Sequence, residues 1–230
     1  MPVLQILDNT FYGGGDDAMD LEGDAHIEGN LIMNFVKDQW NGALGNSNGL
    51  SAGDAHVVGH DYYLARNTFI NVQDITTVKE NSFVRFFNNT VIDSLPGAIS
   101  FAPPDDPVPG KGGIFEGNIF YNSPSPFKDI PALPANFVVR NNLLTADQVG
   151  YGTGNISGDP RFVDVANRDV HLLPGSPALG AGPNGIDMGS QVAQWVSISG
   201  EPPVNTPQTS ATLTVGGPSI VAYKYKVNNG

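Results

Sequence analysis

A short motif of the form apolar-x-x-Asn-x-apolar recurs along the chain and constrains its fold more than any other feature. The asparagines of its six copies are Asn9, Asn30, Asn67, Asn89, Asn118 and Asn142. Successive asparagines are separated by 21, 37, 22, 29 and 24 residues. A constant minimum with variable additions is typical of a solenoid whose coils share short strands and differ in their loops. One coil cannot bury its own apolar side, so we expect successive coils to stack around a common core.

The asparagine of each motif has two properties that suit a turn between stacked strands. Asparagine tolerates left-handed backbone angles better than most residues that carry a side chain. Its amide can also bond to the coils above and below, which would form a ladder of stacked amides. We therefore predict that the six asparagines are structural, and we assign them no chemistry.

Two features of the chain resemble a known group of proteins. The asparagine turns and short β-branched strands are similar to the right-handed parallel β-helix of the pectate-lyase-like superfamily. The segment GDPRFVDVANRDVHLLPGSPALGAGPNGIDMGS, residues 158–190, resembles the closing segment of many secreted bacterial β-helix proteins. The resemblance implies an all-β fold with a right-handed parallel β-helix over residues 1–198. That superfamily includes lyases, glycosidases, epimerases, esterases and proteins that only bind.

The composition changes after this region. Residues 199–210, SGEPPVNTPQTS, are rich in Pro, Ser and Thr and predict a linker. Residues 211–230 alternate like two strands joined by a Gly-rich turn, which predicts the truncated start of an Ig-like β module. The first residues, MPVLQILDNTF, lack a signal-peptide pattern and read as the middle of a repeat. We therefore expect a fragment of a longer bacterial protein that is extracellular or on the cell surface.

Charge and composition exclude several classes of partner. The formal net charge is −12, so a polyanion such as nucleic acid would be repelled. No apolar run reaches the length of a membrane-spanning helix, and we expect no membrane partner. The absence of cysteine excludes disulfides and thiolate metal sites. An acidic surface of this kind suits divalent cations.

Carboxylates gather on one predicted strand near the N-terminus. Alternation along this strand sends Met19 and Leu21 inward, so Asp20 and Glu22 point outward. Counting back from each asparagine aligns the strand with those of the following coils. The position of Asp20 then continues through Ser51, Thr77 and Ser100, and that of Glu22 continues through Gly53 and Lys79. Neighbouring coils lie about 4.8 Å apart, so these side chains are expected to share one patch.

The same segment carries a more specific likeness. GGDDAMDL, residues 14–21, resembles the Gly-Asp-Asp segment of the polygalacturonase family, whose carboxylates perform inverting hydrolysis. Asp16, Asp17 and Lys79 match the family's pattern, whereas Asn48 and Thr77 stand where the family has histidine and arginine. Inverting hydrolysis needs two carboxyl groups roughly 6.5–9.5 Å apart, which a patch spanning two coils could supply. A lyase would instead need a base, and Lys79 is the basic residue of the patch.

Two insertions add candidate ligands. Trp40 lies in the insertion at residues 34–49, where its ring could stack on a sugar. The insertion GDAHVVGHD, residues 53–61, repeats the tetrapeptide Gly-Asp-Ala-His of residues 23–26. The asparagine alignment nevertheless pairs Asp24 with Asp61 and His26 with Tyr63. We therefore expect the insertion to lean over the flank that bears Asp24 and His26.

These residues lead to a set of site predictions. Close carboxylates and imidazoles suit acid–base chemistry and divalent cations such as Ca²⁺, Zn²⁺ or Mn²⁺, and no organic cofactor is expected. The predicted catalytic residues are Asp17, Asp20, Glu22, His56 and Lys79. The predicted substrate-binding residues are Trp40 and Ser51, and the predicted metal ligands are Asp24, His26, Asp54 and His60. Arg66, Arg85 and Arg140 are expected to pair with Glu28 or Glu116.

Three functions remain open at this point. The first is a carbohydrate-active enzyme of the glycoside hydrolase or polysaccharide lyase type. The second is a divalent-metal-dependent hydrolase of esters or phosphoesters that uses the Asp and His cluster. The third is a non-catalytic glycan-binding or spacer module. The predicted partner is a polysaccharide or a small ester, and self-association through the open N-terminal coil is a further expectation because exposed strand edges favour it.

Overall fold

The computed structural model describes residues 3–37, 47–53, 56, 58–101, 108–130, 136–191, 197–199, 210, 212 and 214–216. The chain forms two compact units, Met1–Gln191 and Val192–Gly230. Across the described residues the regular structure is β-strand, apart from the short 3-10 helices η2 (Val149–Tyr151), η3 (Val165–Asn167) and η4 (Pro183–Gly185). None of the described helices could cross a membrane. The predicted all-β fold class is confirmed.

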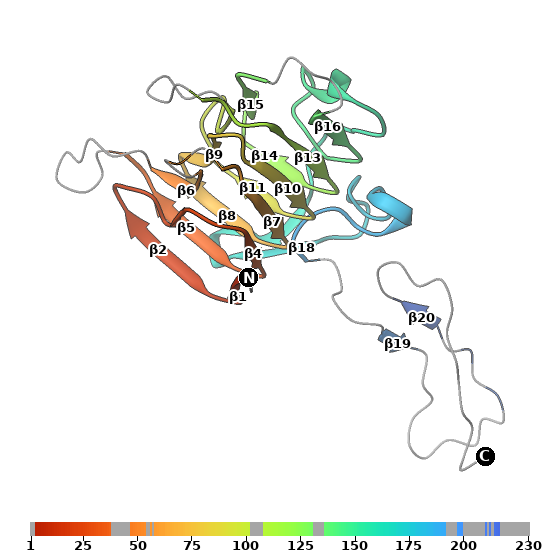
Figure 1. Ribbon diagram of the computed structural model, residues 1–230. Helices are drawn as coiled ribbons and strands as arrows, with labels where there is room; N and C mark the ends of the chain where they lie inside the picture. The colour runs from red at the N-terminus through yellow and green to blue at the C-terminus, as the bar shows by residue number, and fades with distance from the viewer. Residues whose placement is uncertain are drawn as a thin grey trace, which may run out of the picture. The chain divides into compact units, whose positions relative to one another are not determined.

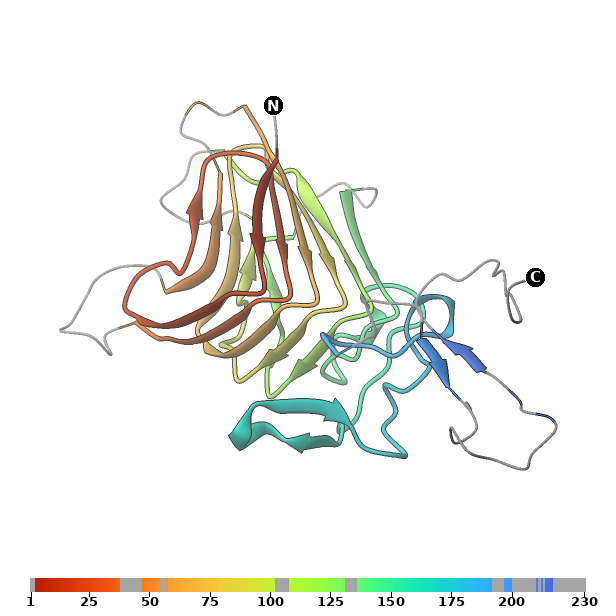
Figure 2. The same cartoon turned by 90° about the horizontal axis from the view of Figure 1, so that it is seen from below.

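The first unit is a parallel β-helix whose successive coils contribute strands to three parallel sheets (Figure 1 and Figure 2). Sheet A contains β1 (Leu4–Leu7), β4 (Ala25–Glu28), β7 (Asp61–Ala65), β10 (Phe83–Phe87), β13 (Gly112–Glu116) and β16 (Phe137–Arg140). Sheet B contains β2 (Thr10–Gly14), β5 (Leu31–Phe35), β8 (Thr68–Val72), β11 (Thr90–Ile92) and β14 (Ile119–Tyr121). Sheet C contains β3 (Asp20–Leu21), β6 (Asn48–Ala52), β9 (Asp74–Val78), β12 (Ile99–Ser100) and β15 (Phe127–Lys128).

The core lies between the sheets and is built from columns of stacked apolar side chains. Residues alternate along each strand, so that Ala25 and Ile27 of β4 are buried while the intervening His26 is partly exposed. One column follows the register of sheet A through Ile27, Leu64, Phe86, Phe115 and Val139, all of them buried. Each added coil therefore removes apolar surface of the previous coil from water, which stabilises the stack.

The motif asparagines form the predicted ladder at the turn between sheets A and B. The backbone N–H of Asn67 donates to Oδ1 of Asn89 at 2.9 Å, and that of Asn89 donates to Oδ1 of Asn118 at 2.7 Å. The same bond links every neighbouring pair from Asn9 onward and continues past Asn142 to Asn155, a seventh member.

The left-handed residue of this turn is the residue before the asparagine, not the asparagine itself. Positive φ angles occur at Asp8, Gly29, Arg66, Asn88, Gly117 and Asn141. A single left-handed residue redirects the chain from sheet A to sheet B, and the asparagine that follows has ordinary angles. The expectation that the ladder asparagines themselves occupy left-handed angles is therefore wrong.

The closing segment returns over the outer face of sheet B. It contains a short antiparallel pair, β17 (Phe162–Asp164) and β18 (Asp169–Leu172). Ala178 and Met188 then form a small buried cluster with Ile119 and Leu143. Further along, the hydroxyl of Ser190 lies 2.7 Å from that of Thr68 on β8. The outer face of sheet B is thus partly covered, whereas sheets A and C have no such cover from this segment among the contacts of the described residues.

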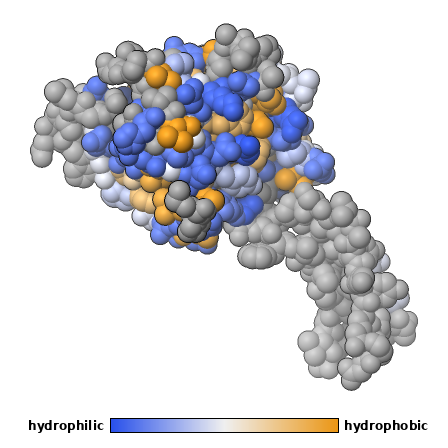
Figure 3. Space-filling model, viewed as in Figure 1, coloured by the Kyte–Doolittle hydropathy of each residue, from blue (hydrophilic) through white to orange (hydrophobic). Residues whose placement is uncertain are grey.

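The second unit contains one antiparallel pair in its described part, β19 (Ser197–Ser199) with β20 (Thr214–Gly216). The predicted linker at 199–210 and the predicted Ig-like start at 211–230 lie mostly outside the described residues and remain predictions. On the face of the first unit seen in Figure 3, hydrophilic residues predominate and apolar residues form small separate groups.

Candidate functional site

The outer face of sheet C carries the predicted column of polar residues. Asp20 pairs in register with Ser51, Ser51 with Thr77, and Thr77 with Ser100. Asp20 is exposed, whereas Ser51 and Ser100 are buried. The predicted alignment of these four residues is therefore confirmed. We call Asp17, Asp20, Ser51, Thr77 and Lys79 the sheet-C patch.

Asp17 begins a chain of hydrogen bonds that crosses this sheet. Its Oδ1 accepts from the backbone N–H of Asn48 at 3.1 Å and from Asn48 Nδ2 at 2.7 Å. The hydroxyl of Thr77 in turn donates to Oδ1 of Asn48 at 3.0 Å. Asn48 and Thr77 are the residues that replace the histidine and arginine of the polygalacturonase pattern. In this chain they hold Asp17 in place from two successive coils.

Burial raises the pKa of Asp17 above its ordinary value of 3.8, because desolvation disfavours the charged carboxylate. The hydrogen bonds from Asn48 lower the pKa in part, and the negative charges of Asp16 and Asp20 raise it further. A carboxyl group whose pKa is shifted upward, close to a second carboxyl group, is an arrangement that suits acid–base catalysis.

The second predicted column of sheet C also lies on successive coils. The backbone N–H of Gly53 donates to Leu21 O at 3.4 Å, and that of Lys79 donates to Ala52 O at 3.0 Å. Continuing this register by one residue places Glu22, Gly53 and Lys79 in a row. Of these three residues Glu22 is the exposed one. A Cβ atom at Gly53 would lie 2.5 Å from Cγ of Lys79, so the lysine stem crosses directly over this glycine.

Three predicted site residues cannot be placed with the others. Trp40 and Asp54 lie outside the described residues. His56 is described and exposed, and it lies in a turn of the second insertion rather than on a strand of sheet C. Their predicted roles in substrate binding, metal binding and catalysis remain predictions.

Asp24, His26, His60 and Asp61 lie together at the outer face of sheet A. His26 pairs in register with Tyr63, and Oδ1 of Asp24 accepts the backbone N–H of Asp61 at 2.9 Å, as the asparagine alignment predicted. Nδ1 of His60 lies 3.4 Å from Oδ1 of Asp24. The second insertion therefore does reach the flank that bears Asp24.

The predicted metal ligands in the described part do not converge on one point. Nε2 of His26 is directed to Oε2 of Glu28, at 2.5 Å, while His60 is directed to Asp24. Among the described residues no three His, Asp or Glu side chains are gathered as a cation site. Asp54 lies outside those residues, so the metal site stays a prediction.

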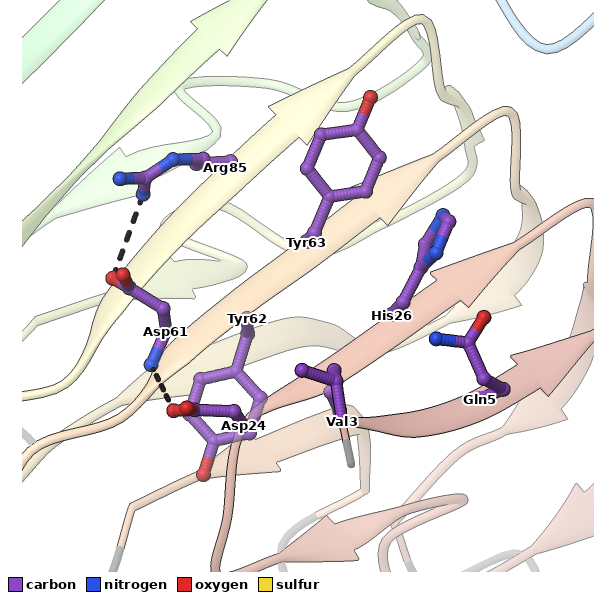
Figure 4. A pocket seen from close by; sticks show the side chains of 9 residues that line it. Val3, Gln5, Asp24, His26, Asp61, Tyr62, Tyr63 and Arg85 are labelled. Carbon is purple, nitrogen blue, oxygen red and sulfur yellow. Dashed lines mark hydrogen bonds and ion pairs between the residues drawn. The ribbon is translucent and has the colours of Figure 1, made fainter. Parts of the chain in front are cut away.

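A groove of about 510 Å³ opens on the outer face of sheet A, beside Asp24, His26 and Asp61 (Figure 4). Its lining comes from β1, β4, β7 and β10 and from the residues that precede them. We call it the sheet-A groove, and its polar lining is Gln5, Asp24, His26, Asp61, Tyr63 and Arg85.

The sequence prediction missed Gln5, Tyr63 and Arg85 as site residues. The register of sheet A aligns Gln5 with His26, His26 with Tyr63, and Tyr63 with Arg85. The same counting from the asparagines that aligned the sheet-C patch could have found this column.

Two of the three predicted arginine pairs are confirmed. Arg66 pairs with Glu28, and Arg140 NH2 lies 2.9 Å from Oε2 of Glu116. Arg85 instead lies 3.5 Å from Oδ1 of Asp61, so its predicted pairing with a glutamate is wrong. Arg85 aligns in register with Tyr63 rather than with Ala65 or Glu116, and its guanidinium also lies 5.0 Å from the ring centre of Phe83.

Comparisons with protein families, with curated proteins and with solved structures found no match to this chain. Function is therefore inferred from the geometry of the sheet-C patch and the sheet-A groove.

Proposed function

We propose that the protein is a carbohydrate-active enzyme that hydrolyses glycosidic bonds on the outer face of sheet C. The observation that carries the proposal is the half-buried carboxyl of Asp17, whose pKa is raised by desolvation and which lies within electrostatic reach of exposed Asp20. The likeness of the repeat to the pectate-lyase-like superfamily supports the same assignment. Because polysaccharides are found mainly outside cells, the proposal includes an extracellular or cell-surface location.

Hydrolysis of a glycoside uses one carboxylic acid to protonate the leaving oxygen and a second carboxylate as base or nucleophile. Asp17 is assigned the role of acid. Its Oδ1 already accepts two hydrogen bonds from Asn48, so the transferable proton belongs on Oδ2. Asp20 is assigned the role of base or nucleophile.

The remaining residues of the face bind or position. Asn48 is a positioning residue, because it fixes the carboxyl of Asp17 and is itself held by Thr77. Ser51, which the sequence predicted to bind substrate, lies between Asp20 and Thr77 in the column; because it is only 5% exposed, it is assigned to the support of this face beneath the substrate. Lys79 supplies a positive charge, which would favour a substrate with acidic groups or serve as the base of a lyase.

The test is product formation from a panel of neutral and acidic polysaccharides by the intact chain and by Asp17→Asn and Asp20→Asn. New reducing ends are expected from at least one substrate, with turnover lowered at least a hundredfold in both variants. Asp159→Asn is the matched control, because Asp159 is an exposed aspartate of the closing segment and asparagine can keep its bond from the N–H of Arg161. The control should retain full activity.

Three results would count against the proposal. No product from any substrate would overturn the enzyme assignment and favour a module that only binds. Full activity in Asp17→Asn would remove Asp17 from the acid role. Unsaturated sugar ends, which absorb ultraviolet light, would indicate a lyase and move the role of base to Lys79.

A further inference from the structure

We infer that the sheet-A groove is a binding site for a neutral saccharide, separate from the catalytic face proposed on sheet C. The groove lies on the outer face of a different sheet of the coil, and the sequence predictions assigned it no sugar. Its volume of about 510 Å³ is in the range of roughly 300–1,000 Å³ that is usual for small-molecule sites. The inference concerns binding alone and does not depend on hydrolysis.

An upright aromatic side chain stands in the groove. Tyr63 is 36% exposed, although it lies in the middle of a six-stranded sheet. Edge contacts with the rings of His26 and Phe87, whose centres lie 4.9 and 5.5 Å away, fix the ring on two sides. A held, partly exposed tyrosine presents apolar ring surface with a polar end at little entropic cost. The C–H face of a pyranose ring has the matching chemistry.

Charged side chains that can bind pairs of sugar hydroxyls lie beside this ring (Figure 4). The side chains of Asp61 and Arg85 are 64% and 38% exposed, and they are joined only by a long contact of 3.5 Å. A carboxylate can accept from two neighbouring hydroxyls, and a guanidinium can donate to two oxygens in a plane. Gln5 supplies both a donor and an acceptor on the first coil. Neighbouring coils about 4.8 Å apart therefore offer both donors and acceptors along the groove.

The balance of charge in the groove favours a neutral ligand. Asp24 and Asp61 place two carboxylates in it, whereas Arg85 is its one guanidinium among the described residues. A uronate would meet these carboxylates and the net charge of −12 of the chain. An organic cation would meet Arg85 on the same wall. A saccharide without charge can use both signs, because its hydroxyls donate and accept.

The test is calorimetric or NMR titration of the intact chain with neutral oligosaccharides of glucose, mannose, galactose and xylose, and with an oligouronate. Asp17→Asn serves as the background, so that the ligand is not consumed. At least one neutral oligosaccharide is expected to bind, and Tyr63→Ala in this background should weaken binding about tenfold. Tyr12→Ala is the matched control, because Tyr12 is 65% exposed on sheet B and lies outside the groove. It should leave the affinity unchanged.

Asp61→Asn is a second groove variant, which keeps the test valid if Tyr63→Ala fails to fold. Asp61 is an exposed residue at the first position of β7, so its replacement should not disturb the fold. Its expected effect is also a loss of affinity, at least fivefold, with an unchanged circular dichroism spectrum. The inference is overturned if no neutral oligosaccharide binds or if both groove variants keep the original affinity. It is also overturned if the oligouronate binds more tightly than every neutral ligand and Tyr63→Ala weakens that binding, which would place the oligouronate in the groove rather than beside Lys79. Binding in this background, together with no product from any polysaccharide with the unaltered chain, would support the groove while overturning the proposed enzyme, so the two failures are distinguishable.

Discussion

Replacement of Asn89 by alanine tests whether the asparagine ladder stabilises the stack of coils. Asn89 is fully buried, and its Oδ1 accepts both the backbone N–H and the side-chain amide of Asn67. Its own amide donates to Leu64 O at 3.0 Å and to Oδ1 of Asn118 at 3.2 Å. Alanine removes all of these bonds and adds no compensating contact.

The expected loss follows from the partners that remain. The buried backbone N–H of Asn67 loses its acceptor, which costs about 1–3 kcal/mol. The bonds to Leu64 O and Asn118 Oδ1 are lost as well, and each net contribution is about 0.5–1.5 kcal/mol. Asn89→Ala should therefore lower the free energy of unfolding by about 2–6 kcal/mol. That is a large part of the roughly 5–15 kcal/mol that a folded domain usually has.

Urea denaturation followed by circular dichroism measures this loss, and amide exchange at Asn67 should accelerate. The control is Asn9→Ala in the first coil, where the ladder asparagine is exposed and its backbone N–H, which alanine keeps, bonds to Asn30. The control should change the free energy of unfolding by less than about 0.5 kcal/mol. If the two variants differ by less than about 1 kcal/mol, the ladder does not stabilise the inner coils as argued.

Three further changes test other parts of the structure. Asp17→Asn should raise the thermal midpoint at pH 7, because asparagine can accept the same bonds from Asn48 without burying a charge. The raised pKa of Asp17 means that its protonated form is favoured in the fold, so wild-type stability from this group is full below pH 3.8 and is lost as the pH rises through the folded pKa. The advantage of Asp17→Asn should therefore shrink as the pH falls toward 3.8, and an advantage independent of pH would contradict the cause given. Gly112→Ala should lower the free energy of unfolding, measured by urea denaturation, by at least about 2 kcal/mol, because φ is +143° and a Cβ would lie 1.9 Å from Asn136 O. Gly23→Ala is the control and should be neutral, because a Cβ there would meet no atom within 4 Å. The metal site predicted from the sequence requires that His26→Ala and His56→Ala lower the zinc or manganese content by elemental analysis, and an unchanged content in both would refute it.

The repeat predicted the parallel β-helix because one spacing rule sets both the turns and the register. Counting from the asparagines placed Asp20 against Ser51 and His26 against Tyr63. The counting works because each ladder asparagine lies at the same turn of its coil and so fixes the register of the neighbouring strands. The ladder member Asn155 escaped the pattern because Gly152 stands where the other copies have an apolar residue.

The parts that the sequence did not predict depend on side-chain conformation and on distant contacts. Asn48 was recognised only as a departure from a family pattern, yet it connects Asp17 to Thr77. Spacing along the chain does not tell which rotamer an asparagine adopts or which donor it meets. The column of Gln5, His26, Tyr63 and Arg85 follows the same register and could have been counted, but its exposure and the groove around it depend on how side chains from four coils pack.

The closing segment changes how the coils depend on one another. In a plain stack each coil contacts only its neighbours, so an end coil can open while the rest stays folded. Here the backbone N–H of Ser190 donates to Oγ1 of Thr90, and that of Gly189 donates to Gly117 O. These two bonds join the closing segment to two earlier coils, and they span 100 and 72 residues of the sequence. The middle coils therefore cannot open unless these bonds to the closing segment break. The β-helix should unfold more nearly as one cooperative unit than as a series of separable coils.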